Sequence, residues 1–304
     1  MVSIPGLDDL LRDKKRSGGY KLGIRKASGM TMSRTGIEFL SIRDQYGPVA
    51  LVTGASSGIG KSFAELLAAK GLDLVLVARR VQRLDELAAR LEKESKVKVR
   101  VCQTDLADVM AAQHILDATA SLDIGLVISN AGFGFKGDYA SGDPNVMTEM
   151  LRVNCNTPML LTHGFVPRLR KRGKGGIVLT SSVEGLIGCP FSAAYAASKA
   201  FVKSLGEGLW GELTPEGIDV LTLCPGATDT EAPRLQGIDP ATLQNVMSPD
   251  EVARLTLENL QNGPTYIPSE HYRASFERLL SMPRRDALTV MARSIRKVKS
   301  SDAG

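Results

Sequence analysis

Apolar residues gather in short runs along the middle of the chain, separated by longer stretches in which apolar positions recur with helical spacing. The short runs indicate buried strands, at 49–53, 73–78, 97–102, 125–129, 176–180, 218–223 and 265–267. The stretches between them predict helices, over 61–70, 81–94, 109–121, 144–170, 193–213 and 248–261. This alternation predicts an α/β fold with a doubly wound, parallel, seven-stranded sheet, helices on both faces, and a single domain.

A glycine-rich turn directly follows the first predicted strand. Gly54, Gly58 and Gly60 stand between that strand and a helical pattern. Glycine lets the backbone approach a pyrophosphate, and the free N–H groups at a helix N-terminus favour an anion. The turn therefore predicts a dinucleotide-phosphate site, although a tight strand-to-helix turn needs glycine even where it binds nothing.

A tyrosine and a lysine share one face of the predicted helix 193–213. Tyr195 and Lys199 are four positions apart, so their side chains lie one turn from each other. A nearby cation favours the phenolate and lowers the phenol pKa, which suits a group that gives and takes protons. Ser182 ends a predicted strand thirteen residues earlier and offers a hydroxyl. On a surface helix the same pair would be only a solvated contact.

Six elements, in this order over roughly residues 49 to 230, resemble the short-chain dehydrogenase/reductase family, whose fold is of the Rossmann type. The matching elements are TGxxxGxG from Thr53 to Gly60, NNAG as Ser129-Asn130-Ala131-Gly132 with serine in first place, Asn154 in a V-N segment, Ser182, YxxxK as Tyr195 and Lys199, and PGxxxT from Pro225 to Thr230.

The resemblance implies an enzyme that transfers hydride between a nicotinamide and a carbonyl or secondary alcohol, with Tyr195 as general acid and base. It implies that Ser182 binds the carbonyl oxygen and that Lys199 lowers the tyrosine pKa and holds the nicotinamide ribose. Asn154 would bind a water that relays protons to Lys199; the alternative is a helix residue that fills a gap in backbone hydrogen bonding, and in this family the two roles coexist. The implied catalytic residues are Asn154, Ser182, Tyr195 and Lys199.

The resemblance also implies a set of cofactor contacts. Asp105 would contact the adenine amine, or act as an ordinary turn or helix-capping aspartate. Thr228 and Thr230 would reach the carboxamide or the pyrophosphate, or one of them would only cap the loop. The implied contacts are Gly54, Ser56, Ser57, Gly58, Ile59, Gly60, Arg79, Arg80, Asp105, Leu106, Asn130, Ala131, Gly132, Tyr195, Lys199, Pro225, Gly226, Thr228 and Thr230.

The end of the second strand bears on the choice of cofactor. An NAD-selecting site places a carboxylate there to bind the ribose 2′-hydroxyl, whereas this chain has Ala78 followed by Arg79 and Arg80. Two arginines suit a 2′-phosphate, so the sequence predicts NADP, with Arg79 as the first phosphate contact and Arg80 as the second. The alternative is that both arginines face solvent.

The segment from about 226 to 250 lacks a clear period and predicts a mobile apolar lid over a hydrophobic substrate, such as a fatty-acyl, steroid-like or aromatic ketone. The chain also has a weaker likeness to long-chain 3-ketoacyl and 17β-hydroxysteroid reductases, carried by Tyr46-Gly47-Pro48 and Lys61. This likeness also favours a hydrophobic substrate. Glu184 would contact a polar substrate group or pair with a lysine or arginine. The predicted apolar lining is Phe133, Phe135, Val183, Leu186, Ile187, Phe191, Pro233, Leu235, Ile238, Leu243, Val246 and Met247.

Charge is concentrated at the two ends of the chain. Residues 1–48 form a basic N-terminal extension with nine Lys/Arg and five Asp/Glu, and 284–304 carry six and two. The catalytic domain is expected over 49–270 and a C-terminal amphipathic helical extension over 271–304. Basic excess confined to the tails argues against a nucleic-acid groove. The tails are either solvated or in contact with an anionic membrane or an acidic carrier protein.

Composition agrees with one large domain: the chain has 304 residues, and 43% of them are hydrophobic. Four cysteines without CxxC spacing and three unpaired histidines predict no metal site and no disulfides, as in the reducing cytoplasm. No apolar run approaches 18 residues and no secretion signal is recognised, so neither export nor a membrane span is expected. The resemblance implies a homodimer or homotetramer.

Two other function classes remain open. A dinucleotide-binding sensor or scaffold would keep this fold without turnover, since fold does not fix function. An isomerase or dehydratase would use the bound cofactor without consuming it.

Overall fold

The structure, a computed structural model, describes residues 30–33, 36–39, 41–235, 243 and 245–301. Most of the basic N-terminal extension, residues 1–29, and Ile238 of the expected lid lie outside the described residues. The chain divides into two compact units, Met1–Leu40 and Ser41–Gly304. In the described part of the first unit, β1 (Met30–Ser33) pairs antiparallel with β2 (Gly36–Phe39).

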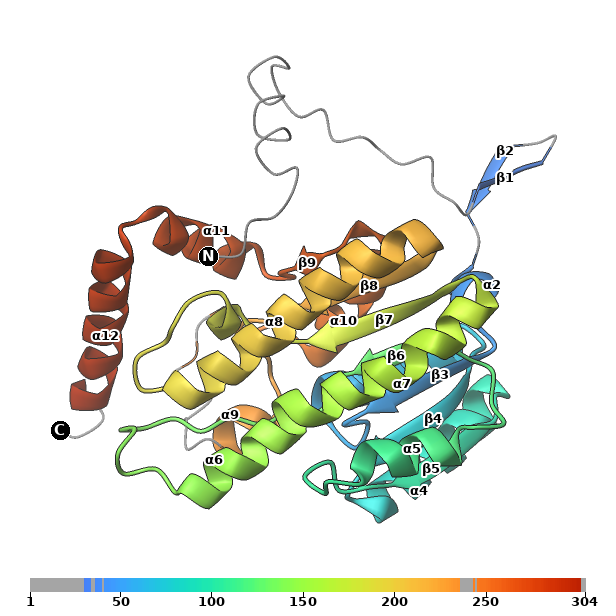
Figure 1. The fold of residues 1–304 in the computed structure, drawn as a ribbon, viewed down its shortest axis with the longest axis horizontal. Helices are drawn as coiled ribbons and strands as arrows, with labels where there is room; N and C mark the ends of the chain where they lie inside the picture. The colour runs from blue at the N-terminus through green and yellow to red at the C-terminus, as the bar shows by residue number, and fades with distance from the viewer. Residues whose placement is uncertain (1–29, 34–35, 40, 236–242, 244, 302–304) are drawn as a thin grey trace. The chain divides into compact units, whose positions relative to one another are not determined.

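The second unit is built on one parallel sheet of seven strands in the order β5-β4-β3-β6-β7-β8-β9 (Figure 1). Each strand pairs in parallel with its neighbours. The first strand of this sheet, β3, lies in its interior. The chain then passes through β4 to β5 at one edge and returns to β6, on the other side of β3. This order confirms the predicted doubly wound sheet and puts a topological switch point between β3 and β6. The strands are β3 (Val49–Thr53), β4 (Asp73–Ala78), β5 (Val99–Gln103), β6 (Ile124–Ser129), β7 (Gly175–Thr180), β8 (Ile218–Leu223) and β9 (Thr265–Tyr266).

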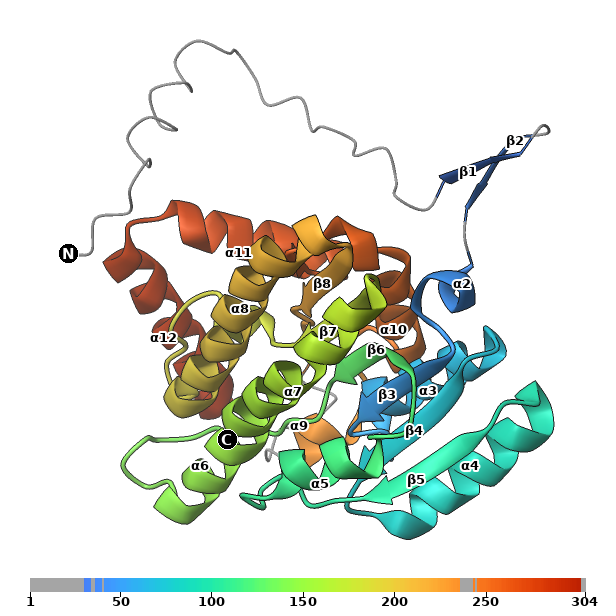
Figure 2. The same cartoon turned by 45° about the vertical axis from the view of Figure 1, so that its right-hand side comes forward.

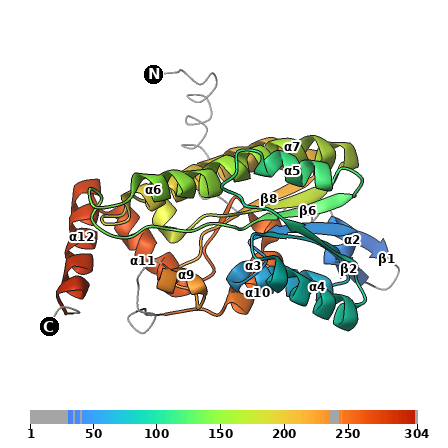
Figure 3. The same cartoon turned by 90° about the horizontal axis from the view of Figure 1, so that it is seen from below.

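Helices cover both faces of the sheet, as Figure 3 shows from below. On one face lie α3 (Gly58–Ala69), α4 (Val81–Ser95) and α10 (Pro249–Glu258). On the other lie α5 (Ala111–Ala118), α7 (Thr157–Arg172) and α8 (Ala193–Leu213), with α8 beside β7 and β8 in the view of Figure 2.

Alternate strand residues supply the two cores, because side chains along a strand point to opposite faces. In β3, Ala50 and Val52 join a cluster with Phe63 of α3, whereas Leu51 packs with Phe165 of α7. All five residues are buried. The inner strands β3, β4, β6, β7 and β8 are therefore buried on both faces, which explains why they read as continuous apolar runs, whereas β5 at the edge alternates.

The predicted continuous helix 144–170 is divided in the structure. α6 (Pro144–Leu151) leads into a π-helical turn at Arg152–Asn156, and α7 follows. The N–H of Thr157 donates to the carbonyl of Arg152, five residues back. Consecutive residues Val153 and Asn154 are both buried as a result. Helical spacing of apolar residues does not reveal this extra residue in the turn.

Residues 41–48, grouped above with the N-terminal extension, pack with the second unit. Tyr46 of α2 (Ile42–Tyr46) is only 2% exposed, and its hydroxyl donates to Asp219 of β8 over 2.8 Å. Arg172 and Lys174 donate to the carbonyls of Gly47 (2.6 Å) and Asp44 (2.9 Å). The buried ring and these bonds attach the segment to the amino ends of β7 and β8, opposite the carboxyl ends of the strands described in the next subsection.

Two C-terminal helices, α11 (Glu270–Ser281) and α12 (Arg284–Ser301), complete the second unit. Phe276 and Ala287 form a buried cluster with Val183 and Ile187, against which Leu186 also packs. Three side chains expected to line a substrate cavity are thus partly or wholly occupied in packing against α11 and α12. Within the part of the chain that the structure describes, no helix is long and apolar enough to cross a membrane.

Candidate active site

The carboxyl ends of β3, β6 and β7 meet at one rim of the sheet through a short hydrogen-bond network. The hydroxyl of Thr53, at the end of β3, accepts from the backbone N–H groups of Asn130 (3.0 Å) and Ala131 (3.1 Å). The hydroxyl of Thr180, at the end of β7, donates to the side-chain oxygen of Asn130 over 3.3 Å. These contacts bring the NNAG-like segment and the start of the glycine turn together, as strand order at a switch point requires.

The glycine turn has a backbone that only glycine accommodates well. Gly54 (φ 70°) and Gly58 (φ 52°) are left-handed. A Cβ on Gly60 would collide with the carbonyl of Gly54 and lie 2.7 Å from the amide nitrogen of Asn130. Helix α3 begins at Gly58, and its N-cap residue Ser57 makes no capping bond with its side chain. The first N–H groups of α3 therefore keep their capacity to bind an anion, while Ile59 packs against the core below.

Lys199 and Asn154 converge on Gly132. The ammonium of Lys199 is 3% exposed and donates to the carbonyl of Thr180 over 2.9 Å. A Cβ placed on Gly132 would lie 2.8 Å from the Lys199 nitrogen and 3.0 Å from the side-chain oxygen of Asn154. Only a residue without a side chain leaves both polar groups room at this point.

The amide of Asn154 is occupied by backbone and hydroxyl partners. Its nitrogen donates to the carbonyl of Phe133 (2.8 Å) and to the hydroxyl of Ser198 (3.0 Å), and its oxygen accepts from the N–H of Phe133 (3.1 Å). The structure thus displays the second of the two expected roles, filling a gap in backbone hydrogen bonding where the π-helical turn meets α8.

Tyr195 and Ser182 lie within hydrogen-bonding reach of each other. Burial raises the pKa of Tyr195 above its ordinary value, the charge of Glu184 raises it further, and the hydrogen bond with Ser182 acts in the opposite direction. The expected lowering of the Tyr195 pKa by Lys199 is not what the structure shows. The Lys199 nitrogen lies 5.8 Å from the ring centroid, and burial lowers the pKa of this lysine to about 8.

Glu184 is paired with a lysine, the second of the two alternatives given for it. Its carboxylate lies 2.5 Å from the ammonium of Lys136, and both side chains are partly buried. The pair joins the loop after β6 to the turn Val183–Gly185, in which the N–H of Glu184 also donates to the Ser182 hydroxyl over 3.1 Å. Lys136 was not anticipated from the sequence, where it stands 48 residues from its partner.

The two arginines after β4 point in different directions. Arg80 donates to the hydroxyls of Ser56 (3.0 Å) and Ser57 (2.7 Å) in the glycine turn. Arg79 instead lies 3.8 Å from Asp105 and 3.4 Å from Glu149. At the glycine turn the structure therefore places Arg80, whereas Arg79 lies at Asp105 and Glu149. The ranking of the two arginines as phosphate contacts stays a prediction. Adjacent residues leaving a strand face opposite ways, and only one of the two can turn back over the glycines.

Two further predicted cofactor contacts, Asp105 and Leu106, lie in the turn after β5. Asp105 accepts from the N–H of Ala107 (3.0 Å), as a turn-capping aspartate does, while the buried Leu106 offers its carbonyl to the hydroxyl of Thr157 (2.8 Å).

The PGxxxT segment lies over the glycine turn. Pro225 accepts from the N–H of Val183 (3.1 Å), and Thr228 donates to the carbonyl of Gly226 (3.1 Å), which makes Thr228 the loop cap. A methyl carbon of Thr230 would be 2.9 Å from a Cβ on Gly58. Of the two threonines, Thr230 is therefore the one at the N-terminus of α3.

Comparison with known proteins identifies this arrangement. A family model described as short chain dehydrogenase matches residues 48–237. The chain belongs to the short-chain dehydrogenase/reductase family.

Two curated relatives of this dehydrogenase share similarity over most of their length. It is 32% identical to a 7beta-hydroxysteroid dehydrogenase of Clostridium sardiniense, over 84% of this chain and 98% of the relative. It is 31% identical to very-long-chain 3-oxoacyl-CoA reductase-A of Danio rerio, over 73% of this chain and 70% of the relative. The likeness to long-chain ketoacyl reductases expected from the sequence is thereby confirmed.

A solved structure also resembles this dehydrogenase. A short-chain dehydrogenase from Sphingobium yanoikuyae in complex with NADPH superposes with a TM-score of 0.72 at 37% identity, covering 80% of this chain and 95% of that one.

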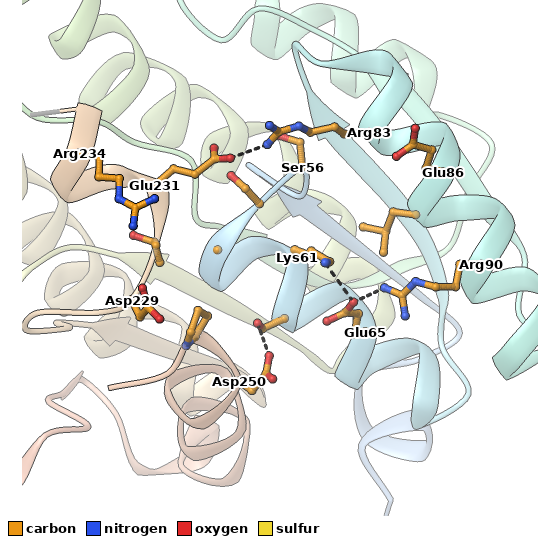
Figure 4. Close-up of a pocket in the computed structure, with 16 residues that line it drawn as sticks. Ser56, Lys61, Glu65, Arg83, Glu86, Arg90, Asp229, Glu231, Arg234 and Asp250 are labelled. Atoms are coloured by element: carbon orange, nitrogen blue, oxygen red, sulfur yellow. Dashed lines mark hydrogen bonds and ion pairs between the residues drawn. The ribbon is translucent and has the colours of Figure 1, made fainter. Parts of the chain in front are cut away.

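One acidic residue of the dehydrogenase site is absent from the sequence-based expectations. Glu231, the first residue of α9 (Glu231–Leu235), pairs with Arg80 (2.7 Å) and Arg83 (2.6 Å). Figure 4 shows it reaching from α9 towards Arg83 of α4, next to Ser56, in a pocket of about 800 Å³ that extends along α3. Its arginine partners are about 150 positions away in the chain, so no local pattern signals the contact.

Proposed function

We propose that the protein is an NADP-dependent oxidoreductase that transfers hydride between the nicotinamide and a carbonyl or secondary alcohol of a hydrophobic substrate. The observation that carries the proposal is the meeting of Tyr195, Ser182 and Lys199 at the strand ends, beside a glycine turn shaped for a dinucleotide. Spacing alone could match by chance, whereas the convergence of these groups in space has no evident structural purpose.

The cofactor assignment is supported by the chemistry around the glycine turn. β4 ends at the apolar Ala78, so the strand end does not supply the carboxylate with which an NAD site binds the ribose 2′-hydroxyl. Arg80, Ser56 and Ser57 together offer a cation and two hydroxyls, which suit a 2′-phosphate. The Sphingobium yanoikuyae protein, which superposes on this chain, is in complex with NADPH.

The residues of this chain then have distinct roles in carbonyl reduction. The reduced nicotinamide, when bound, supplies the hydride. Tyr195 donates a proton to the carbonyl oxygen, and Ser182 donates a hydrogen bond to the same oxygen as negative charge develops on it. Lys199 holds the nicotinamide ribose, and Asn154 fixes the loop at Phe133. A Tyr195 pKa raised by burial keeps the phenol protonated, as a proton donor must be.

A hydrophobic substrate is supported by two aromatic residues in the loop after β6 and by the names of the relatives. Phe133 and Phe135 precede Lys136, whose partner Glu184 lies two residues after Ser182. One relative is named for a hydroxysteroid and another for a very-long-chain 3-oxoacyl-CoA. A steroid skeleton and a very-long acyl chain are both bulky and apolar, and each of the two named substrates carries a carbonyl or hydroxyl at the reacting carbon.

The decisive experiment is NADPH consumption with a panel of hydrophobic ketones by the wild type and Tyr195→Phe. Loss of the proton donor should lower kcat by about 10²–10⁴-fold, while NADPH binding measured by calorimetry stays within about twofold. Tyr139→Phe, which removes a hydroxyl from an exposed tyrosine, is the matched control and should keep wild-type turnover.

Other outcomes select the other function classes. NADPH binding without turnover of any ketone, in wild type and variant alike, would favour a sensor or scaffold. Product formed without stoichiometric NADPH consumption would favour an isomerase or dehydratase. A Tyr195→Phe enzyme as active as the wild type would remove the proposed role of this residue.

Assembly and location complete the proposal. α6, α7 and α8 expose large apolar side chains, which support a homodimer or homotetramer packed through these helices; they are Val146, Leu151, Met159, Leu160 and Phe201. Light scattering that reported only monomers would contradict this.

The four cysteines are free thiols, which supports a cytoplasmic location. The basic tails remain proposed contacts for a membrane surface or an acidic carrier.

A further inference from the structure

Three charged groups meet across the groove beside the glycine turn. The carboxylate of Glu231 places one oxygen 2.7 Å from Arg80 and the other 2.6 Å from Arg83, so each oxygen accepts from a different arginine. Arg80 holds Ser56 and Ser57 at the same time. Hydrogen bonds from Arg83 and then Arg80 hold the pKa of Glu231 at about 2, so the group is a full anion at any working pH.

This cluster has the composition of a phosphate site whose anion is supplied by the chain itself. Two guanidinium groups and two hydroxyls are the donors that bind a phosphate monoester well. A carboxylate is the smaller anion with the same preference for a bidentate guanidinium. Glu231 is therefore chemically equivalent to a ligand for Arg80 and Arg83.

We propose that Glu231 is an internal competitor for the 2′-phosphate of NADP. Its carboxylate engages the arginines that the phosphate requires, so the phosphate binds as Glu231 is displaced from Arg80. This inference rests on the proposed NADP-dependent function. It makes Glu231 a specificity-determining residue that lowers the preference for NADPH over NADH, because NADH carries no 2′-phosphate and has no need of these arginines.

The position of Glu231 couples this competition to the PGxxxT segment. Glu231 directly follows Thr230, whose side chain lies against Gly58 at the N-terminus of α3. Displacing Glu231 from Arg80 thus changes what holds α9 at the glycine turn. Arg80 and Arg83 therefore bind either the 2′-phosphate or the carboxylate at the start of α9.

The test compares full-length wild type with Glu231→Gln by calorimetry, using NADPH, NADH and two probes, adenosine 2′,5′-bisphosphate and adenosine 5′-monophosphate. Glutamine keeps the size of the side chain and removes the charge. NADPH and the bisphosphate should bind the variant about threefold to tenfold tighter, as expected for loss of a partly exposed ion pair. NADH and the monophosphate should change by less than about twofold.

Glu86→Gln is the matched control, because Glu86 lines the same pocket from α4 but takes no part in the Arg80–Glu231–Arg83 cluster. It should leave all four dissociation constants at wild-type values. Arg80→Ala should remove most of the discrimination between the bisphosphate and the monophosphate, since it takes away the contact for which Glu231 competes.

The outcomes separate this inference from the proposed function. A wild type that prefers NADPH, with Glu231→Gln equal or weaker in NADPH affinity, would overturn the competition alone. A wild type that binds NADH as tightly as NADPH, and the bisphosphate no tighter than the monophosphate, would overturn the NADP assignment and the competition with it. A gain in affinity equal for NADPH and NADH would show that Glu231 opposes the dinucleotide as a whole and would also overturn the inference.

Discussion

Lys199 is buried and Tyr195 is partly buried, and for each the loss of water around it shifts the pKa so as to favour the neutral form. The phenol pKa rises, and the lysine pKa falls to about 8. The spacing of these residues predicts their neighbourhood but not this balance, because the spacing says nothing of how much water reaches them. The charge of Glu184 raises the phenol pKa further. The sequence places Glu184 two residues after Ser182 but does not indicate where its carboxylate points.

Glu184→Gln should shift the pH dependence of the reaction. Removing the carboxylate charge lowers the Tyr195 pKa and leaves the ammonium of Lys136 unpaired nearby, which acts in the same direction. Because reduction needs the protonated phenol, the alkaline limb of kcat for ketone reduction should move to lower pH, by about half a unit to one unit. Oxidation of the alcohol needs the phenolate and should gain activity at lower pH.

The measurement is a pair of pH–rate profiles, one for each direction. Glu216→Gln, at a carboxylate paired with Arg170 on another part of the surface, serves as the control and should leave both profiles in place. A shift of the reductive limb to higher pH would contradict the assignment of Tyr195 as the proton donor.

The sequence indicates the residues of this site unevenly. Gly54, Gly58 and Gly60 are recognisable because one local turn requires all three. Lys136 and Glu231 were missed because their partners are far away in the chain. That Arg80 rather than Arg79 contacts the glycine turn could not be inferred, since it depends on which of two adjacent side chains turns back towards Ser56.

Among the elements, α8 shows how a helix is fitted to a sheet. A Cβ on Gly206 would collide with the hydroxyl of Thr222 in β8, whereas a Cβ on Gly208, two residues later, meets open space. The two glycines are alike in sequence and opposite in environment. One permits close packing, and the other only adds freedom to the unfolded chain.

This difference predicts opposite effects of the same substitution. Gly206→Ala should lower the free energy of unfolding by about 1–3 kcal/mol through overpacking. Gly208→Ala should raise it by about 0.5–1 kcal/mol, because alanine is the better helix former. Denaturant unfolding of both variants under one condition measures the contrast, and equal effects would show that α8 does not rest on β8 at Gly206.

Most elements were predictable because their patterns are local. The inner strands are buried on both faces and therefore read as unbroken apolar runs, and the helices between the strands keep their 3.6-residue period. The π-helical turn at 152–156 was not predictable, because Val153 and Asn154 carry no propensity that distinguishes it from an ordinary helix. Residues 41–48 were grouped with the basic extension by composition, while the buried ring of Tyr46 belongs to the sheet.

At the scale of the whole molecule, the boundary between the two units lies at Leu40. Deletion of residues 1–40 should leave the melting temperature of the catalytic unit within about 2 °C, since those residues are a separate unit. Deletion of 1–48 also removes Tyr46 and its bond to Asp219. Loss of a buried aromatic side chain costs about 3–5 kcal/mol, which in a protein of this size lowers the melting temperature by about 5–15 °C.

Thermal unfolding of the two truncated proteins beside the full chain tests the boundary. Tyr46→Ala in the full chain should reproduce most of the loss and separates the effect of the ring from that of chain length. Equal melting temperatures for both truncations would show that residues 41–48 contribute no stability.

The turn at Arg152–Asn156 makes this stretch intolerant of changes in chain length. Because the turn holds one residue more than a regular helix, restoring the regular helix without a deletion would rotate everything beyond it by about 100° about the helix axis, and Leu161 and Phe165 would leave the core. A deletion of one residue that restored the regular helix would keep Leu161 and Phe165 in place but would move Asn154 away from Phe133 and Ser198. The segment should therefore accept replacements of exposed side chains but neither shortening nor lengthening.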